Sequence, residues 1–82
     1  MIIIEIEVPM MGKLYDFQID ENVPLSEVMD EAAEMICQKE QCPVQGDIRR
    51  MLMWNAQSRV QLAKERTAAE NGLWTGSRVL LV

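Results

Sequence analysis

The sequence predicts an α+β fold in which a mixed β-sheet carries one main helix packed across one face. Three observations lead to this prediction. The chain opens with alternating apolar and acidic residues in IIIEIEV, continues with apolar residues recurring every three or four positions, and closes with the apolar run in SRVLLV. A period of two is typical of strands, and spacings of three and four are typical of amphipathic helices. A helix that is apolar on one side needs a sheet to cover it.

The size of the chain favours a single domain over residues 1–82. A chain of this length buries only about 60% of its unfolded surface, so it cannot supply two cores. Hydrophobic residues make up 49% of the sequence and charged residues 26%, an ordinary globular balance. The uncharged apolar stretch at the start is only MIII, too short for a signal-peptide core or a membrane span. We therefore expect a cytoplasmic protein without membrane insertion.

The first two elements are predicted to form a β-hairpin. Alternation over residues 2–8 places Glu5 and Glu7 on a solvent face, and PMMG then supplies turn residues. The segment 13–20 alternates again and reads as the second strand.

From Pro24 the pattern changes to that of an amphipathic helix, which we expect to end before Pro43. Its polar side carries four acidic residues, Glu27, Asp30, Glu31 and Glu34. We interpret them as a solvated face and not as catalytic carboxylates, because they are spread along the helix without a cleft.

The remaining elements complete a β-grasp. We expect a strand at 48–54, a turn at 55–58, a short strand at 59–62, a connection at 63–72 with one helical turn ended by Asn71-Gly72, and a final strand at 77–82. In a β-grasp the first and last strands pair in parallel at the centre of the sheet.

Side chains for catalysis and metal binding are scarce. The chain contains no histidine, which removes the usual general base and the commonest metal ligand. Cys37 and Cys42 are the only cysteines and cannot close a zinc site alone. We expect both to be reduced thiols, with a disulfide between them as the alternative. The prediction is no enzyme, no cofactor and no metal.

Charge is distributed unevenly along the chain. Residues 1–47 carry eleven acidic side chains and two lysines, whereas residues 48–82 carry six basic and two acidic side chains. Such a dipole can orient a protein partner, although solubility alone is an alternative explanation. The net charge of −5 disfavours binding to nucleic acid.

The closing segment ENGLWTGSRVLLV resembles the end of the YukD/EsaB proteins, small ubiquitin-like members of type VII (ESX-like) secretion loci. The matching positions are Glu70, Gly72, Leu73, Gly76, Val79, Leu81 and Val82, with Ser77 where Asp is commoner. The length and order of elements are also similar to those of ubiquitin-like domains. The resemblance implies a non-enzymatic accessory or regulatory protein whose partner is a cytosolic part of the secretion machinery or a regulator of its expression.

Modifiers and sulfur carriers with this fold act through a flexible C-terminal Gly-Gly. Here the last glycine is Gly76 and an apolar run follows it to Val82, so we expect neither conjugation nor sulfur transfer. Two alternatives stay open: a generic β-grasp adaptor unrelated to secretion, and a modifier or carrier that lacks the Gly-Gly tail.

Strand alternation also predicts a binding patch. If Met51 and Met53 face the helix, Leu52 and Trp54 face solvent. They would then lie next to Leu80 and Val82, the outward residues of the final strand. The predicted protein-binding patch consists of Met11, Arg50, Leu52, Trp54, Arg78, Leu80 and Val82. Exposed apolar, aromatic and Arg side chains are typical of protein contacts. A register shifted by one residue would bury Leu52 and Trp54 instead, and a homodimer formed through an edge strand is a further alternative.

Overall fold

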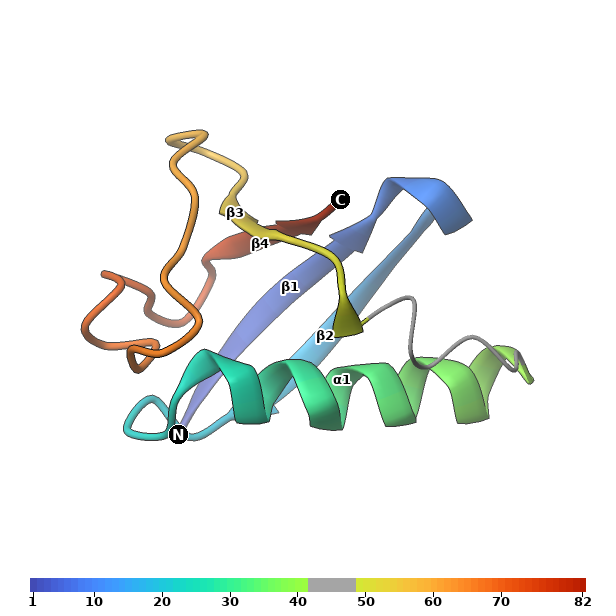
Figure 1. Cartoon of the computed structure of the whole chain (residues 1–82), viewed down its shortest axis with the longest axis horizontal. Coiled ribbons are helices and arrows are strands. Elements are labelled where there is room, and N and C mark those ends of the chain that lie inside the picture. The colour runs from blue at the N-terminus through green and yellow to red at the C-terminus, as the bar shows by residue number, and fades with distance from the viewer. Residues whose placement is uncertain (42–48) are drawn as a thin grey trace.

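The computed structural model describes residues 1–41 and 49–82, and it has the β-grasp architecture that the sequence predicts (Figure 1). Four strands form one mixed sheet in the order β2-β1-β4-β3, and the helix α1 crosses one face of it. The elements are β1 (Ile2–Val8), a short 3-10 helix η1 (Pro9–Met11), β2 (Lys13–Ile19), α1 (Leu25–Glu40), β3 (Met53–Asn55) and β4 (Arg78–Leu81).

The β1–β2 hairpin confirms the first two predicted strands, with β2 ending one residue early at Ile19. The strands pair antiparallel from Ile2 opposite Ile19 to Val8 opposite Lys13. Gly12 closes the turn with a φ of 63°, a left-handed conformation that glycine adopts without steric cost.

The parallel pairing of β1 with β4 at the centre of the sheet is also confirmed. Glu5 lies opposite Arg78 and Glu7 lies opposite Leu80. Just before β4, the backbone N–H of Gly76 donates to the carbonyl of Ile3 over 2.9 Å. This bond fixes the position at which β4 enters the sheet.

Helix α1 begins one residue later than expected, with Pro24 as its N-cap and not in its first turn. The reason lies in the connection after β3. The backbone N–H groups of Leu25 and Ser26 each donate over 2.9 Å, to the carbonyls of Arg66 and Lys64 respectively. The first turn of a helix leaves such donors unsatisfied, and here the chain itself supplies their acceptors.

The predicted strand at 48–54 is wrong in its first half. Strand β3 comprises only Met53–Asn55, and Ile48 lies outside the described residues. The segment before β3 contacts Lys64 and the helix instead of a neighbouring strand. Lys64 Nζ donates to the carbonyls of Arg49 and Met51. Arg49 Nε lies 3.4 Å from a carboxylate oxygen of Asp30 on α1. These contacts direct the chain towards the helix instead of along the sheet edge.

The segment 59–62 returns beside β3 but does not form the predicted strand. It makes a single bridge, between Trp54 and Gln61, flanked by backbone bonds such as Leu62 N–H to Met53 O over 2.8 Å. The turn at 55–58 is confirmed, because the Asn55 side chain accepts from the backbone N–H groups of Gln57 and Ser58.

The connection 63–72 contains the one predicted turn, ended by Gly72 with a φ of 74°. Thr67 and Glu70 form a capping box: each backbone N–H donates to the other side chain, over 3.0 and 3.1 Å. The Asn71 side chain accepts from the N–H of Ala63 over 2.8 Å and donates to the carbonyls of Ala63 and Thr67. Side chains therefore hold this irregular segment together.

The core lies between α1 and the sheet. Its largest fully buried side chains are Ile4, Ile6, Val8, Leu25, Met29, Ile36, Met53, Val79 and Leu81. Cys37 is buried beside them, whereas Cys42 lies outside the described residues. In the described part of the chain, no helix has the length and apolar character needed to cross a bilayer.

Candidate protein-binding surface

The sheet face opposite α1 carries four of the predicted patch residues. Leu52 is 44% exposed and Val82 54% exposed, while Trp54 and Leu80 are half-buried. Their neighbour Met53 is 1% exposed and belongs to the core. The alternative register, which would bury Leu52 and Trp54 and expose Met53, is therefore wrong.

Pairing between strands brings these four residues together. Trp54 lies directly opposite Leu80, and Leu80 lies directly opposite Glu7 of β1. Leu52 and Val82 exchange two backbone hydrogen bonds of 2.8 and 3.1 Å just beyond the ends of β3 and β4. The result is a row of side chains across three strands.

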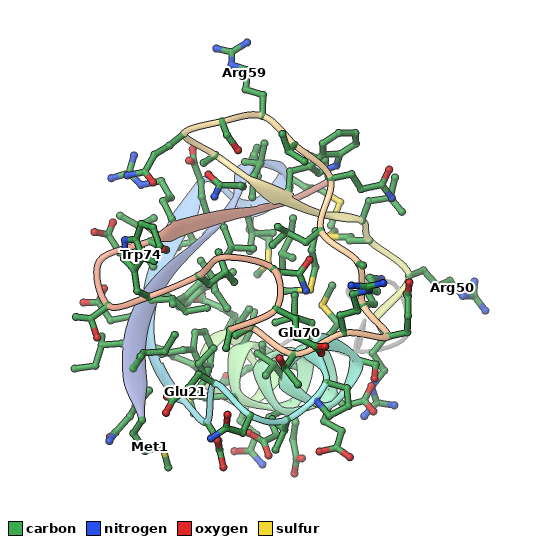
Figure 2. All side chains as sticks on the ribbon, turned by 90° about the vertical axis from the view of Figure 1, so that its left-hand side faces the viewer. Met1, Glu21, Arg50, Arg59, Glu70 and Trp74 are labelled. Atoms are coloured by element: carbon green, nitrogen blue, oxygen red, sulfur yellow. The ribbon has the colours of Figure 1, made fainter. Side chains whose placement is uncertain are left out.

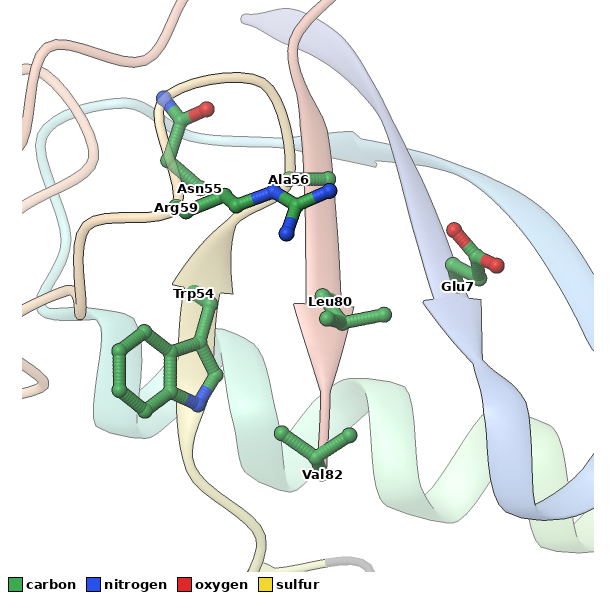
Figure 3. A pocket seen from close by; sticks show the side chains of 7 residues that line it. All are labelled: Glu7, Trp54, Asn55, Ala56, Arg59, Leu80 and Val82. Atoms are coloured by element: carbon green, nitrogen blue, oxygen red, sulfur yellow. The ribbon is translucent and has the colours of Figure 1, made fainter.

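Three of the four residues line an open groove of about 490 Å³, which we call the sheet groove (Figure 3). Leu52 lies outside it and lines a separate hollow with Gln61 and Lys64. The residues that line the sheet groove are Glu7, Trp54, Asn55, Ala56, Arg59, Leu80 and Val82. Figure 3 shows Leu80 in the middle, with Trp54 on one side of it, Glu7 on the other and Val82 just beyond the end of β4. The groove thus has an apolar floor with charged residues beside it.

Trp54 carries an unsatisfied donor. Its indole nitrogen is shielded from solvent and has no hydrogen-bond partner among residues 1–41 and 49–82, and in Figure 3 it points towards Val82. A buried donor without an acceptor costs about 1–3 kcal/mol.

Two predicted patch residues lie elsewhere. Met11 is half-buried and packs against the core, because η1 turns its side chain towards the hydrophobic cluster. Arg50 is exposed, but the segment that carries it is turned towards the helix and does not continue β3, so Arg50 does not line the groove. Figure 2 shows Arg50 and Arg59 extending from the molecule in different directions.

Arg78, the other arginine of the predicted patch, lies next to the groove and not in it. Its guanidinium pairs with a carboxylate oxygen of Glu5 over 3.1 Å across the β1–β4 pair. It lines two smaller hollows that it shares with Glu7 on the same sheet face. Its charge is already neutralised by an intramolecular partner.

Glu7 and Arg59 are groove residues that the sequence analysis did not identify. The outward position of Glu7 follows from the alternation in IIIEIEV, but its place beside Leu80 depends on the β1–β4 register. Arg59 enters the groove from the turn after β3, where it adopts a φ of 60° and donates its backbone N–H to Asn55 O over 2.7 Å. Such a turn conformation is not encoded by hydrophobic periodicity.

The chemistry of the groove suits binding. Within residues 1–41 and 49–82, no group of three or more His, Cys, Asp or Glu side chains is placed to hold a metal ion. The groove brings together an indole, two aliphatic side chains, one carboxylate and one guanidinium. Aromatic and Arg side chains on a partly apolar surface are enriched in protein interfaces.

Comparison with known proteins identifies the fold. No family model matches the chain, and a comparison with curated proteins also gives no match. Among solved structures, the chain is similar to the ubiquitin-like domain of an Arabidopsis thaliana protein, determined by solution NMR. The TM-score is 0.68 at 21% sequence identity, and the match covers 99% of this chain and 74% of that one. The fold is therefore a ubiquitin-like β-grasp.

Proposed function

We propose that this protein is a non-enzymatic ubiquitin-like adaptor that binds another protein through the sheet groove. The observation that carries the proposal is the position of Trp54, Leu80 and Val82. These three side chains gather on the helix-free face and line a groove, although the same strands place Met53, Val79 and Leu81 in the core.

Covering the groove would stabilise a complex. Burial of apolar surface contributes about 25 cal/mol per Å², and aromatic anchors in partly formed pockets often dominate protein interfaces. Val82 is 54% exposed and Trp54 and Leu80 are partly exposed in the isolated chain, so a partner in the groove would remove much of their surface from water.

The test compares two tryptophans. Trp54 lines the groove, whereas Trp74 is 70% exposed and lies outside it. Partners captured from a lysate of the source organism are identified, purified and titrated against the wild type, Trp54→Ala and Trp74→Ala. We expect Trp54→Ala to weaken binding at least about tenfold, as hot-spot truncations do, and Trp74→Ala to leave it unchanged. Loss of binding with Trp74→Ala alone would place the interface elsewhere.

The same proposal extends to a more specific role, that of an accessory or regulatory protein of a type VII secretion system. What supports it is the resemblance of residues 70–82 to the end of the YukD/EsaB proteins. The expected partner is a cytosolic part of the secretion machinery.

Gene neighbourhood tests this extension. A neighbouring gene for a WXG-type substrate or an FtsK/SpoIIIE-like ATPase is the expected result, followed by binding of the purified cytosolic part of that machinery. If neither gene lies nearby and that protein does not bind, the secretion role is wrong and the generic adaptor function stands.

A further inference from the structure

Two charged side chains of the sheet groove have no ionic partner among the residues that the structure describes. Glu7 and Arg59 both line the groove, yet neither side chain forms a hydrogen bond or ion pair with any residue in the described part of the chain. Arg78 on the same face behaves differently, because it is paired with Glu5. The groove therefore presents one negative and one positive charge that the fold leaves unused.

The two charges stand beside a common apolar floor. Glu7 lies directly across the β1–β4 pair from Leu80, and Leu80 lies directly across from Trp54. In Figure 3 Glu7 stands on one side of Leu80, and the guanidinium of Arg59 overlies β4 beside Ala56; Figure 2 shows that Arg59 extends outward from the turn after β3. A ligand seated on Leu80 and Trp54 would have Arg59 and Glu7 within reach.

We propose that the sheet groove takes a segment of a partner protein that presents one large apolar side chain between a carboxylate and a basic group. The apolar side chain packs on Trp54, Leu80 and Val82, the carboxylate pairs with Arg59 and the basic group pairs with Glu7. This inference rests on the proposed function and specifies the chemistry of the partner.

Charge complementarity excludes other kinds of segment. A segment with acidic groups on both sides of its apolar residue would place one of them against Glu7, and a doubly basic segment would meet Arg59. Like charges brought together in an interface oppose binding, and opposite charges fix orientation and select partners. A phosphate backbone is disfavoured for the same reason, because Glu7 faces it.

A helical segment can present the three groups on one face. Residues four positions before and after a central side chain are separated by about 12 Å along a helix axis. Charges at these positions lie on the same helix face as the central residue.

The experiment uses four synthetic alanine-based helical peptides with a central Leu. At the positions four before and four after it they carry Glu and Lys, Glu and Glu, Lys and Lys, or Gln and Gln. Each peptide is titrated into the ¹⁵N-labelled full chain, and the Trp54 indole N–H signal reports groove occupancy. We expect the Glu/Lys peptide to bind about fivefold more tightly than the Gln/Gln peptide, the factor that two exposed ion pairs can supply.

Charge reversal in the protein provides the decisive control. Arg59→Glu should shift the preference to the Lys/Lys peptide, and Glu7→Lys should shift it to the Glu/Glu peptide. The side chains of Glu7 and Arg59 are at least partly exposed and form no hydrogen bond or ion pair within the described part of the chain, so both variants should fold. A shift in preference to the matched peptide supports the inference in a way that a general loss of stability cannot.

Three outcomes would overturn the inference. If all four peptides bind equally and Trp54→Ala abolishes binding, the charge preference is wrong but the proposed function stands. If no peptide perturbs the Trp54 signal, the groove does not take such a segment. If the groove signals move with protein concentration in the absence of peptide, a second copy of the chain is the occupant.

Discussion

The assignment of the two sheet faces can be tested by adjacent substitutions in one strand region. Met53→Ala truncates a side chain that is 1% exposed and packs in the core, whereas Leu52→Ala truncates one that is 44% exposed on the groove face. The backbone hydrogen bonds of Leu52 to Val82 do not involve its side chain and should persist. The two variants therefore differ mainly in which face they alter.

The expected magnitudes follow from burial. Truncating a fully buried Met to Ala removes its transfer free energy and leaves a cavity, at a cost of about 2–5 kcal/mol. Truncating an exposed side chain usually changes stability by less than about 0.5 kcal/mol. For a domain of this size, 1 kcal/mol shifts Tm by about 4–8 °C, so Met53→Ala should lower Tm by at least about 8 °C. Leu52→Ala should lower it by less than about 4 °C.

Thermal unfolding followed by circular dichroism measures both variants, and urea unfolding gives the free energy directly. The same contrast can be repeated on β4, where Leu81 is fully buried and Leu80 lines the groove. Equal destabilisation by Leu52→Ala and Met53→Ala would refute the face assignment, and with it the proposed binding surface.

Three further predictions concern side-chain hydrogen bonds, two of them in the connection 63–72 and one between β2 and α1. Asn71→Ala removes three partly buried hydrogen bonds and should destabilise the fold by about 1–3 kcal/mol in urea unfolding. Tyr15→Phe removes the 2.9 Å bond from the Tyr15 hydroxyl to Glu40 and should cost about 0.5–1.5 kcal/mol in the same assay. Hydrogen bonds from the Thr67 backbone and side chain hold the pKa of Glu70 below its ordinary value of 4.5. The stabilisation linked to this group is present above that value and is lost as pH falls through the lowered pKa, so Thr67→Val should raise the pKa of Glu70 in an NMR titration.

The Asn71 prediction has a matched control, and the Glu70 prediction has a result that would contradict it. Asn22 is exposed and, in the described structure, uses only its backbone N–H in a hydrogen bond to Asp20, so Asn22→Ala should be neutral. If Asn71→Ala is equally neutral, the connection is not held by that side chain. For Glu70, a pKa that stays unchanged in Thr67→Val would show that the threonine hydroxyl contributes nothing to it.

The sequence predicts those elements whose pattern is local and unbroken. Strands β1 and β2 and helix α1 each repeat one period over seven residues or more, so their bounds are nearly correct. Strand β3 is different, because the path of the chain before it depends on Lys64 and Asp30, which are distant in sequence. A periodicity argument cannot detect contacts of that kind.

The residues of the candidate site also fall into two groups, those that a local pattern predicts and those that depend on contacts distant in sequence. Strand alternation predicts that Leu52 and Trp54 share one face and that Leu80 faces away from Val79 and Leu81. The burial of Met53, Val79 and Leu81 decides which face is outward. The presence of Glu7 and Arg59 beside Trp54 and Leu80 requires the register of β1 against β4 and the conformation of the turn after β3. Arg50 was predicted from alternation with Leu52 along one strand, and that alternation does not extend to Arg50 because β3 begins only at Met53.

Alternation along β4 assigns neighbouring side chains to different roles, some to the core and one to the proposed binding groove. Val79 and Leu81 contribute to the core, while Leu80, between them, contributes to the groove. Because successive side chains of a strand point to opposite faces, a substitution at Leu80 changes what the groove can bind with little effect on helix packing. The parallel pairing with β1 then adds Glu7 to the same surface at no cost to the core. A change of partner specificity therefore requires substitutions only on the helix-free face, and the charge-reversed variants at Glu7 and Arg59 test that independence directly.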